Sequence, residues 1–556
     1  MIVAKRPTFS LVMPAYKGSE DTIKKAIDSI QDQDMESWQL IVVINGEWEG
    51  KAKTKQIVNK YEKKDKRIAL LEVAEANACT ARNEGGEIAQ GKYISFFSSD
   101  FYMYPGALRK WLKEFKAHPE ADFIYSGYGL MKDGQMTQHK AMSEPFDPWR
   151  LRIENYIDGG FPMKREVFEK CKWNPAVKSL NDWDFWLTVI DHNFKGYYML
   201  DNTYAAELPK EGGLSYDSHA NWLERVSQIK ALHRIKERDI CVVSLGAAPH
   251  GKRLAKIIGA DFKFAPQNKP HKYKAIYLIG FYVGTGDSAM AHTAVFKTPN
   301  SDTIPVIHWI GTDVLQIVGA GYKVCYNDMK ALVEVIDKCV NLTEFEQTEG
   351  ELRSIGISSK IIPLPIEDDI DVMPLPSKFT CAIYTPKTST AGQIYNLDLM
   401  KDIIKSCPDI NFLLFGGGLM DFKAKNVKNM GWCEKEDYYN KVIAQSSCLM
   451  RITYHDGMPV APIEWRLAGR DAITTVQMKY IHFAGTGIIH KENYADRKEK
   501  IINLLRAVKK DQKQGVKDVQ EARVYYKTLT SPKRFKKALE KIIDDKRLVN
   551  KNAKKA

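Results

Sequence analysis

Asp100 is a single carboxylate that directly follows an apolar segment, in the stretch FFSSDFYMYPGAL at residues 96–108. The residues KYISFF predict a buried strand, and Pro105-Gly106 predict the turn that follows. Ligands of open α/β sheets bind at the carboxyl ends of strands, where a carboxylate can hold a divalent metal and the metal can hold a phosphate. The alternative is a helix N-cap, because Asp is a common cap residue and YPGALRKWLKEF predicts a helix start. This stretch alone does not decide between the two.

The first 100 residues must position Asp100, and they alternate between apolar strands and helical patterns. The predicted strands are FSLVMPAY, WQLIVVING, RIALLEVA and KYISFF, and the first helix would begin with Ser19 as its cap. This alternation predicts an α/β fold with a mostly parallel sheet and helices on both faces. Asp100 then lies at the carboxyl edge of the sheet.

The order of these segments resembles the inverting family 2 glycosyltransferases, which have the GT-A fold. The matching landmarks are LVMPAY, IVVING, ACTARNEGGEIAQGKYISFFSSD and PGAL, followed by GGFPMKREVFEKCKWNPAVKSLNDWDFWLTVI, and together they cover about residues 7–216. The resemblance implies a nucleotide-sugar donor and Mn²⁺ or Mg²⁺ at Asp100. It makes Asp182 the general base, with Asp184 as a competitor for that role.

The same resemblance assigns the remaining candidate residues of this half. Gly160 and Trp183 would lie on the acceptor side. Trp183 and Trp186 could present an aromatic surface to a sugar, although core packing is expected for at least one of them. The donor side would comprise Pro14, Ala15, Tyr16, Asn45, Arg82 and Ser98.

The residue types fit the chemistry of sugar transfer. A divalent cation can neutralise the charge that develops on a diphosphate leaving group, and an acceptor hydroxyl needs a carboxylate base as it attacks. The sequence also departs from the family. Ser98 replaces the first acid of the usual DXD motif, Ile44 and Asn45 replace the acids that contact the nucleoside, and the expected histidine is absent near Ala206-Glu207. Because Asp100 and Asp182 are retained, we expect an active domain.

A second α/β pattern begins after residue 238. The strand ICVVSLG precedes GAAPHGKRLAKIIG, which nearly matches the phosphate-binding motif GxxxxGK[ST] through Gly246, Gly251 and Lys252. Arg253 stands where the Mg²⁺-binding hydroxyl would be, so a tight turn that opens a Rossmann-like unit is the better interpretation. The prolines of KIIPLPIEDD interrupt regular structure before another alternating set. Two such lobes describe a GT-B fold.

The second lobe resembles family 4-type retaining glycosyltransferases, over about residues 239–510 of the chain. The resemblance rests on Asp456 and Glu464, which flank the heptapeptide GMPVAPI. It implies a metal-independent donor site with Asp456, Gly457 and Glu464, and Lys387 is a candidate phosphate contact. The alternative roles of the two acids are a helix cap and a surface ion pair, in a scaffold without catalysis.

Positive charge is concentrated at the end of the chain. Residues 505–556 contain seventeen Lys/Arg and six Asp/Glu, whereas the whole chain has a net charge of +13. A basic helix can bind DNA or an anionic membrane face, and the alternative is a solvated helix that packs its apolar side on the body. Nine cysteines without a CxxC pair, and the lack of an apolar run of about 18 residues, predict a cytoplasmic protein, and the basic tail would allow peripheral attachment at the inner membrane face.

Together these patterns predict a GT-A domain at residues 1–230 and two GT-B lobes at 238–370 and 371–510, followed by a basic helical tail at 511–556. The predicted function is a glycosyltransferase, bifunctional if both modules are active, that moves sugar from a nucleotide-sugar donor to a hydroxyl acceptor. A surface-glycan precursor is the favoured acceptor. A hydroxylated base in DNA, as in bacteriophage DNA glycosylation, and a protein are the alternatives. The non-enzymatic alternative is a carbohydrate-binding platform without catalysis.

Overall fold

The computed structural model divides the chain into two units, Met1–Glu237 and Arg238–Ala556. It describes residues 6–17, 20–141, 143–208, 222–236, 238–244, 248–263, 273–281, 303–318, 336, 339–366, 370–386, 394–418, 422–433, 437–485, 493–512 and 515–555. Three residues named above, Ser19, Gly246 and Lys387, lie outside the described residues. No described helix has the length and apolar character needed to cross a membrane.

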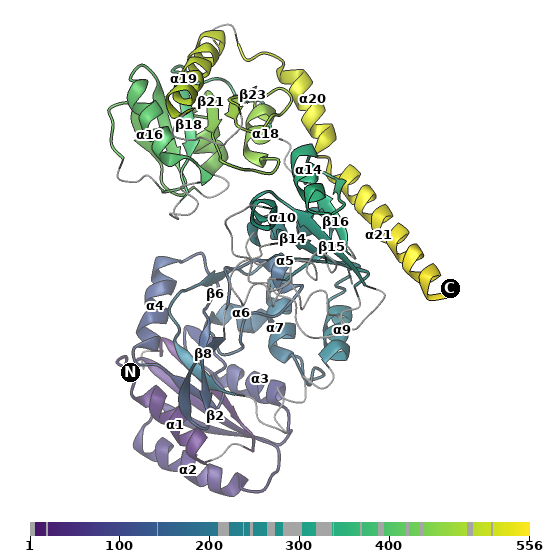
Figure 1. Cartoon of the computed structure of the whole chain (residues 1–556). Coiled ribbons are helices and arrows are strands. Elements are labelled where there is room, and N and C mark those ends of the chain that lie inside the picture. Colours follow the sequence, from purple (N-terminus) through teal and green to yellow (C-terminus); the bar gives the residue numbers. More distant parts are fainter. Residues whose placement is uncertain are drawn as a thin grey trace. The chain divides into compact units, whose positions relative to one another are not determined.

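Unit 1 is built on a seven-stranded sheet (Figure 1). Its strands, in spatial order, are β10 (Gly196–Tyr198), β6 (Phe123–Tyr125), β9 (Met163–Lys164), β4 (Tyr93–Ser95), β1 (Phe9–Ala15), β2 (Trp38–Asn45) and β3 (Ile68–Val73). The four strands β4, β1, β2 and β3 are parallel, as the alternating pattern predicts, and β9 is inserted antiparallel beside β4. The unit also contains α1 (Glu20–Gln31), α2 (Lys51–Lys64), α3 (Ala78–Ile88), α4 (Ala107–Ala117), α5 (Pro148–Leu151), α6 (Arg165–Lys170), α7 (Asn181–Asp191) and α9 (Trp222–Leu232).

Close packing of α3 on the sheet explains the glycines of the segment NEGGEI. A Cβ atom on Gly85 would lie 2.4 Å from Val12 of β1 and 2.8 Å from Val43 of β2. A larger residue would therefore push the helix off the buried face of both strands, because real Cβ contacts are never that short. This contact fixes α3, and with it Arg82, relative to the carboxyl edge of the sheet.

A second, four-stranded sheet carries the residues that follow Asp100. Its order is β5 (Phe101–Met103), β11 (Tyr204–Glu207), β7 (Tyr128–Lys132) and β8 (Gln135–Ala141). Asp100 immediately precedes β5, and the next helix, α4, begins at Ala107 after Gly106, whose φ is 73°. The N-cap interpretation of Asp100 is therefore wrong. The carboxylate lies between two sheets, at a strand end.

Unit 2 contains two lobes, each with a six-stranded, entirely parallel sheet. The first lobe has the order β13 (Asp261–Lys263), β12 (Ile240–Val243), β14 (Ala275–Ile279), β15 (Ile304–Trp309), β16 (Val340–Thr343) and β17 (Lys360–Ile361), with helices α10 (Ala248–Ile258), α12 (Thr312–Val318) and α14 (Glu346–Ser354). The second has the order β20 (Val427–Asn429), β19 (Asn411–Phe415), β18 (Thr380–Tyr384), β21 (Cys448–Arg451), β22 (Asp471–Thr474) and β23 (His482–Phe483), with α16 (Leu397–Ser406), the π-helix η1 (Tyr438–Ile443), α18 (Val460–Leu467) and α19 (Tyr494–Asp511).

Gly251 does not form part of a phosphate loop in this structure. It lies inside α10, where a Cβ atom would approach Phe262 of β13 to 2.7 Å and Ser244 to 2.8 Å. The glycine therefore permits close packing of α10 on its sheet. This agrees with the interpretation of the segment as the opening of a Rossmann-like unit rather than a nucleotide-triphosphatase motif.

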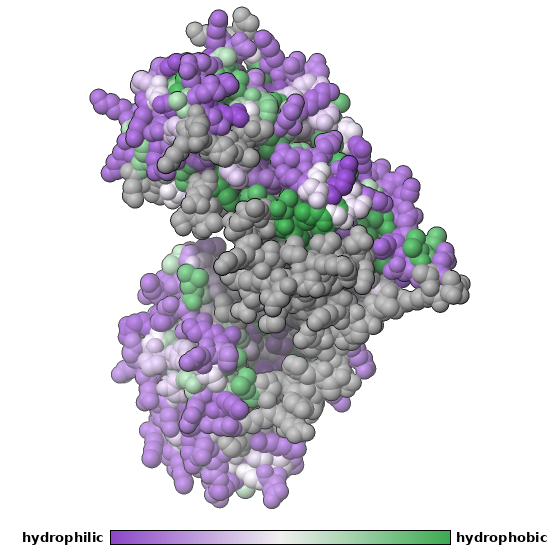
Figure 2. All heavy atoms as spheres, viewed as in Figure 1, coloured by the Kyte–Doolittle hydropathy of each residue, from purple (hydrophilic) through white to green (hydrophobic). Residues whose placement is uncertain are grey.

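The basic tail forms α20 (Val519–Leu529) and α21 (Pro532–Lys555), and their inner faces are packed. Helix α20 contacts α18 of the second lobe, whereas α21 contacts β15 and α10 of the first lobe. Phe535, Leu539 and Ile543 of α21 are buried, and the Phe535 ring lies 6.3 Å from His308 and 6.4 Å from Tyr277. The tail thus joins the two lobes, while the visible face of α21 carries mostly hydrophilic side chains (Figure 2).

The packing of α21 predicts that Phe535→Ala destabilises unit 2 by about 3–5 kcal/mol, the usual cost of emptying a buried aromatic site. Chemical denaturation of the full chain, followed by tryptophan fluorescence, measures the effect. Lys536→Ala on the exposed side of the same helix is the matched control, with an expected change below about 0.5 kcal/mol. Equal stabilities of the two variants would show that the tail is not part of the folded unit.

Candidate active site

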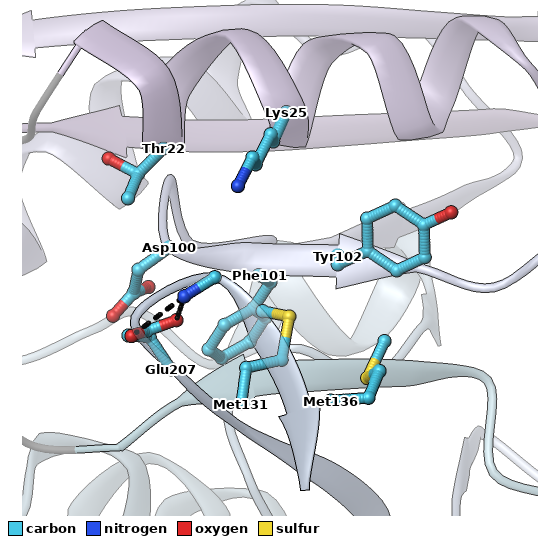
Figure 3. Close-up of a pocket in the computed structure, with 9 residues that line it drawn as sticks. Thr22, Lys25, Asp100, Phe101, Tyr102, Met131, Met136 and Glu207 are labelled. Carbon is cyan, nitrogen blue, oxygen red and sulfur yellow. Dashed lines mark hydrogen bonds between the residues drawn. The ribbon is translucent and has the colours of Figure 1, made fainter.

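Asp100 and Glu207 lie at the polar end of a pocket of about 330 Å³ in unit 1 (Figure 3). The backbone N–H of Glu207 donates to the Asp100 carbonyl at 3.2 Å, because β11 pairs antiparallel with β5. The Glu207 carboxylate accepts from the N–H of Gly134 at 3.1 and 3.3 Å. Desolvation, followed by the charges of Asp158 and Glu207, raises the pKa of Asp100 to about 6.

The remainder of that pocket is mostly apolar. Phe101, Tyr102, Met131 and Met136 line it from the second sheet, and Thr22 and Lys25 face it from α1. The polar end therefore presents two carboxylates to a space in which α1 supplies a hydroxyl and an ammonium group. Two hard oxygen donors beside a cavity are the ligand type that Mg²⁺ and Mn²⁺ prefer.

Asp158 is a third carboxylate, and its negative charge raises the pKa of both Asp100 and Asp182. It accepts from the Tyr204 hydroxyl at 2.6 Å and from the Gly160 N–H at 2.8 Å. The Tyr204 ring is stacked between Phe101, at 4.9 Å, and Tyr128, at 5.5 Å. Desolvation raises the pKa of Asp158 in spite of these two donors. Gly160, which the sequence predicted on the acceptor side, thus holds the Asp158 carboxylate through its backbone N–H.

Asp182 is held at the start of α7. Its Oδ1 accepts from the Trp183 N–H at 2.9 Å, and its Oδ2 accepts from the Asn155 side chain at 2.9 Å. Desolvation and the charge of Asp158 raise the pKa of Asp182 to about 6, although the Trp183 N–H and Arg82 oppose the shift. A carboxylate with this pKa is mostly ionised at neutral pH but is more basic than an ordinary aspartate.

Arg82 is the cation that faces these acids. Its positive charge opposes the rise in pKa of Asp100, Asp158 and Asp182. The guanidinium lies 4.3 Å from the centre of the Trp173 ring and 3.4 Å from the Asn181 oxygen. Its Nε atom is buried and has no hydrogen-bond partner among the described residues. Arg82 is therefore oriented mainly by stacking on Trp173, which leaves a donor for another ligand.

The structure corrects the expectation that tryptophans of α7 form a sugar-facing surface. Trp183 and Trp186 are both buried, and their indole N–H groups donate to the carbonyls of Leu151 at 2.7 Å and Asp158 at 3.2 Å. Trp183 therefore supports the site from within the core and does not reach an acceptor. The physical reason is the helical period, which turns Asp182 outward and its neighbour inward.

Asp184, the competitor for the base role, is 2% exposed and bonded to His233 at 2.8 Å. His233 also contacts Asp191 at 3.3 Å. Burial lowers the pKa of His233, but its hydrogen bonds to the two aspartates outweigh that effect and leave the pKa raised. Asp184 thus has a structural partner and is withdrawn from solvent, whereas Asp182 is only partly buried.

The predicted donor-side residues lie at the ends of β1, β2 and β4. Pro14 and Ala15 end β1, Tyr16 follows with 40% of its surface exposed, and Ser98 lies just before Asp100. Asn45 ends β2 and is 2% exposed. The Oδ1 of Asn45 and the Nε1 of Trp48 are buried without hydrogen-bond partners among the described residues. Since such atoms normally have partners, they mark a position where a polar ligand group fits.

A second polar cluster lies between the lobes of unit 2. Arg451, at the end of β21, binds Asp456 at 2.7 Å, and Arg253 of α10 lies 3.6 Å from Glu464 of α18. The Tyr439 hydroxyl donates to Glu464 at 3.2 Å. Gly457 fits tightly against the first lobe, because a Cβ atom there would lie 2.4 Å from the Ile310 carbonyl. The two acids that the sequence singled out therefore lie in one cluster.

Sequence reasoning missed several residues of these sites, among them Trp48. Asp158 and Asn155 lie on an irregular segment, where the only signal was the Asp-Gly-Gly sequence at 158–160. Glu207 was noted only as the place of a missing histidine. Arg451 was not noticed, because nothing in a strand end of sequence CLMR indicates that its last side chain turns toward Asp456.

The His233–Asp184 pair predicts a pH-dependent stability of unit 1. A histidine whose folded pKa is raised stabilises the fold below its unfolded pKa of about 6.5, and this contribution is lost as the pH rises through the folded pKa. His233→Gln should therefore lose about 1.5–3 kcal/mol at pH 6 and less at pH 9. Thermal unfolding across this range, with the exposed His192→Gln as control, measures the difference. A pH-independent loss would contradict the assignment of a charged pair.

Comparison with known proteins places unit 1 in a family. Residues 10–172 match the model for glycosyl transferase family 2. The chain is 30% identical over 201 residues to TuaG of Bacillus subtilis, a putative teichuronic acid biosynthesis glycosyltransferase, in an alignment that covers 35% of this chain and 76% of TuaG. It is 24% identical over 196 residues to an uncharacterized glycosyltransferase of Methanocaldococcus jannaschii, which covers 34% of this chain and 67% of that protein.

Among solved structures, residues 1–349 of S. aureus TarS in complex with UDP-GlcNAc match with a TM-score of 0.33 and 19% identity, over 40% of this chain and 66% of that one. The family match falls on the unit that gathers Asp100, Asp158 and Asp182. The chain therefore belongs to glycosyl transferase family 2 through its GT-A-like α/β unit, and it is an enzyme that transfers sugar from a nucleotide-sugar donor.

Proposed function

We propose that unit 1, as a domain spanning about residues 1–230, transfers the sugar in one displacement with Asp182 as the general base. The observation that carries this proposal is the partly buried Asp182 carboxylate, whose pKa is about 6 and whose two oxygens are fixed by Asn155 and Trp183. The acceptor O–H proton passes to Asp182 as the acceptor oxygen bonds to the anomeric carbon. The bond from that carbon to the phosphate oxygen breaks, and the nucleoside diphosphate leaves with the electron pair.

Asp100 and Glu207 fit a divalent cation, Mn²⁺ or Mg²⁺. Their carboxylates share one end of a pocket, and the charge of Glu207 contributes to the raised pKa of Asp100. No group of three potential ligands from His, Cys, Asp and Glu occurs among the described residues. Mg²⁺ is usually held by one or two carboxylates together with substrate phosphates and water, so two carboxylates suffice. The cation, when bound, neutralises charge on the leaving diphosphate.

The other residues bind and orient the donor. Arg82, stacked on Trp173, offers its guanidinium to the diphosphate beside the acids. Asn45 and Trp48 offer a buried oxygen and a buried N–H to the nucleobase, and Tyr16 offers an exposed ring beside Trp48, at a centroid distance of 6.2 Å. An amide and an indole at this end replace the acids usual in the family. They can form hydrogen bonds with the polar edge of a base without adding negative charge.

We favour a surface-glycan precursor as the acceptor. Support comes from TuaG, whose name assigns it to teichuronic acid biosynthesis, and from an O-antigen biosynthesis protein of Myxococcus xanthus that is 25% identical over 170 residues. Hydroxylated DNA bases and proteins remain alternative acceptors, and a carbohydrate-binding platform is the non-catalytic alternative for unit 2. None of these three has a specific supporting contact among the described residues.

The second candidate function is a metal-independent nucleotide-sugar site in unit 2, with lobes at about residues 238–370 and 371–510 as in GT-B enzymes. Two parallel sheets and the cluster of Asp456, Glu464, Arg253 and Arg451 between them support this proposal. The cluster combines arginines that fit phosphates with carboxylates that fit sugar hydroxyls. The alternative of a simple surface ion pair fits less well, since Glu464 is 7% exposed.

The tail, proposed as residues 511–556, keeps its predicted role in contacting polyanions. Exposed Lys533, Arg534, Lys536, Lys537 and Lys541 remain on α21 although its apolar side is packed. Such a face attracts DNA or anionic lipid through charge, with an affinity that falls with salt. Peripheral attachment at the inner membrane face remains a prediction that rests on these charges.

Asp182→Asn should lower kcat by about 10²–10⁴-fold, since the amide keeps the shape but cannot accept the proton. In the wild type, kcat should fall as the pH drops below about 6, where Asp182 becomes protonated. Asp184→Asn is the matched control, and it should reduce stability while kcat changes only a few-fold. Release of nucleoside diphosphate in the presence of acceptor measures both. The opposite ranking of the two variants would transfer the base role to Asp184.

Glu207→Gln should raise the Mn²⁺ concentration for half-maximal activity by about tenfold or more, because one charged ligand is lost. Asp100→Ala should abolish metal-dependent turnover. Direct Mn²⁺ binding, measured by electron paramagnetic resonance in the presence of nucleoside diphosphate, gives a readout independent of activity. Glu87→Gln, which removes an exposed partner of Lys172, is the control. Unchanged Mn²⁺ binding in Glu207→Gln would remove this residue from the site.

Glu464→Gln should weaken metal-free nucleotide binding by unit 2 by about tenfold, the effect of one charged hydrogen bond. Calorimetry on the full chain measures this binding, and Asp100→Ala together with a chelator limits nucleotide binding by unit 1. Glu346→Gln, at an exposed position of α14, serves as the control variant. An affinity for UDP, GDP and ADP that does not respond to Glu464→Gln would favour a scaffold role for unit 2.

A further inference from the structure

We propose that Lys25 is a phosphate-binding residue of unit 1, which takes part of the negative charge of a nucleoside diphosphate while a divalent cation at Asp100 and Glu207 takes the rest. This inference rests on the metal site proposed above and deepens it. The phosphates are those of the donor and, after transfer, of the leaving group. The role of Lys25 is additional to the roles of the two acids and of Arg82.

Lys25 faces the cavity of about 330 Å³ from α1, and Asp100 and Glu207 lie at the polar end of the same cavity (Figure 3). Its ammonium group lies against the turn between β7 and β8, because a Cβ atom on Gly134 would be 2.5 Å from Nζ. The N–H of that glycine donates to the Glu207 carboxylate at 3.1 Å. A glycine at this turn, with a φ of 74°, therefore leaves the space in which the ammonium group lies near Glu207.

The Lys25 ammonium group has no ion pair and no hydrogen bond among the described residues. The neighbouring Lys24 differs, since it pairs with Glu20 at 3.6 Å and does not line the cavity. Lys25 is also exposed, so its ammonium group can exchange water for a ligand without first breaking a contact within the protein. An ammonium group has three donors and no acceptor, which suits it to phosphate oxygens.

The charges of the residues that line the cavity decide which ligand it accepts. Without a metal, the two carboxylates outweigh Lys25 by one negative charge and repel a phosphate. A divalent cation cancels the two carboxylates, so Lys25 then leaves one net positive charge. The buried side chains of Phe101 and Met131 in the wall offer no strong acceptor that would compete for the ammonium group. The cavity therefore favours a diphosphate when the cation is bound, and Lys25 supplies part of that preference.

Loss of the Lys25 charge should have different effects on the metal and on the diphosphate. Lys25→Gln removes a positive charge near two carboxylates, so the affinity for Mn²⁺ alone should stay unchanged or rise by up to about threefold. The same change removes a charged contact to phosphate, so the Mn²⁺-dependent affinity for a diphosphate should fall by about tenfold. A substitution that merely disturbed the metal site would weaken the binding of both.

The experiment measures both affinities on the full chain. Electron paramagnetic resonance measures the binding of Mn²⁺ alone. Calorimetry measures UDP and GDP with saturating Mn²⁺ and again with chelator, and the difference is the metal-dependent part. Lys25→Arg should keep most of the diphosphate affinity, and added salt should reduce the difference between the wild type and Lys25→Gln. Lys24→Gln is the matched control and should behave as the wild type, and thermal unfolding verifies that each variant is folded.

The outcomes separate the role of Lys25 from the proposed metal site. If the wild type binds neither UDP nor GDP in a Mn²⁺-dependent manner, the metal site is wrong and the role of Lys25 is wrong with it. If Asp100→Ala abolishes that binding while Lys25→Gln behaves like Lys24→Gln, the metal site stands and the role of Lys25 is wrong. If Lys25→Gln weakens Mn²⁺ alone and the diphosphate to the same extent, Lys25 supports the metal site and binds no phosphate, which also overturns the proposal.

Discussion

The mutual repulsion of carboxylates at the edge of two sheets is the constraint on which unit 1 depends. Asp100, Asp158 and Asp182 are each desolvated enough to raise their pKa, and neighbouring acids raise the pKa of Asp100 and Asp182 further. Such an arrangement destabilises the fold unless other contacts fix it, and groups of this kind occur mainly where chemistry requires them. Here the fixing contacts are the stacked rings around Tyr204, the Gly160 and Trp183 N–H groups, and the charge of Arg82.

The local part of this site could be predicted from the sequence, and the non-local part could not. The apolar run predicted the strand that precedes Asp100, but that strand ends at Ser95, and Asp100 lies directly before the start of β5. Its role as a cap was excluded only when β5 was seen to follow it. Glu207 and Asp158 approach Asp100 through the pairing of β11 with β5 and through the Tyr204 hydroxyl, contacts across about 50 to 100 residues that no periodicity encodes. The burial of Trp183 follows from the sequence of α7, which carries apolar residues on most sides of the helix.

In unit 2, the alternating pattern predicted two lobes, and two parallel six-stranded sheets are present. The spacing of Phe535, Leu539 and Ile543 indicates one apolar side of a helix, yet its partner on β15 could not be read from the sequence. The same limit applies to Arg253. Its type was visible as a departure from a phosphate-loop motif, whereas its approach to Glu464 depends on how the two lobes of this unit pack.

The two clusters differ in net charge, because carboxylates are in excess in unit 1, whereas arginines balance the carboxylates in unit 2. A diphosphate brings negative charge, and the acids around Asp100 accept it only if a cation stands between them, which explains why the proposed chemistry of unit 1 needs a divalent metal. In unit 2, two arginines already balance two acids, so the donor site proposed for that unit would not need a metal to neutralise its carboxylates. The choice of side chain at each strand end therefore sets the charge that a ligand would meet, which is an excess of carboxylates in unit 1 and a balanced set of ion pairs in unit 2.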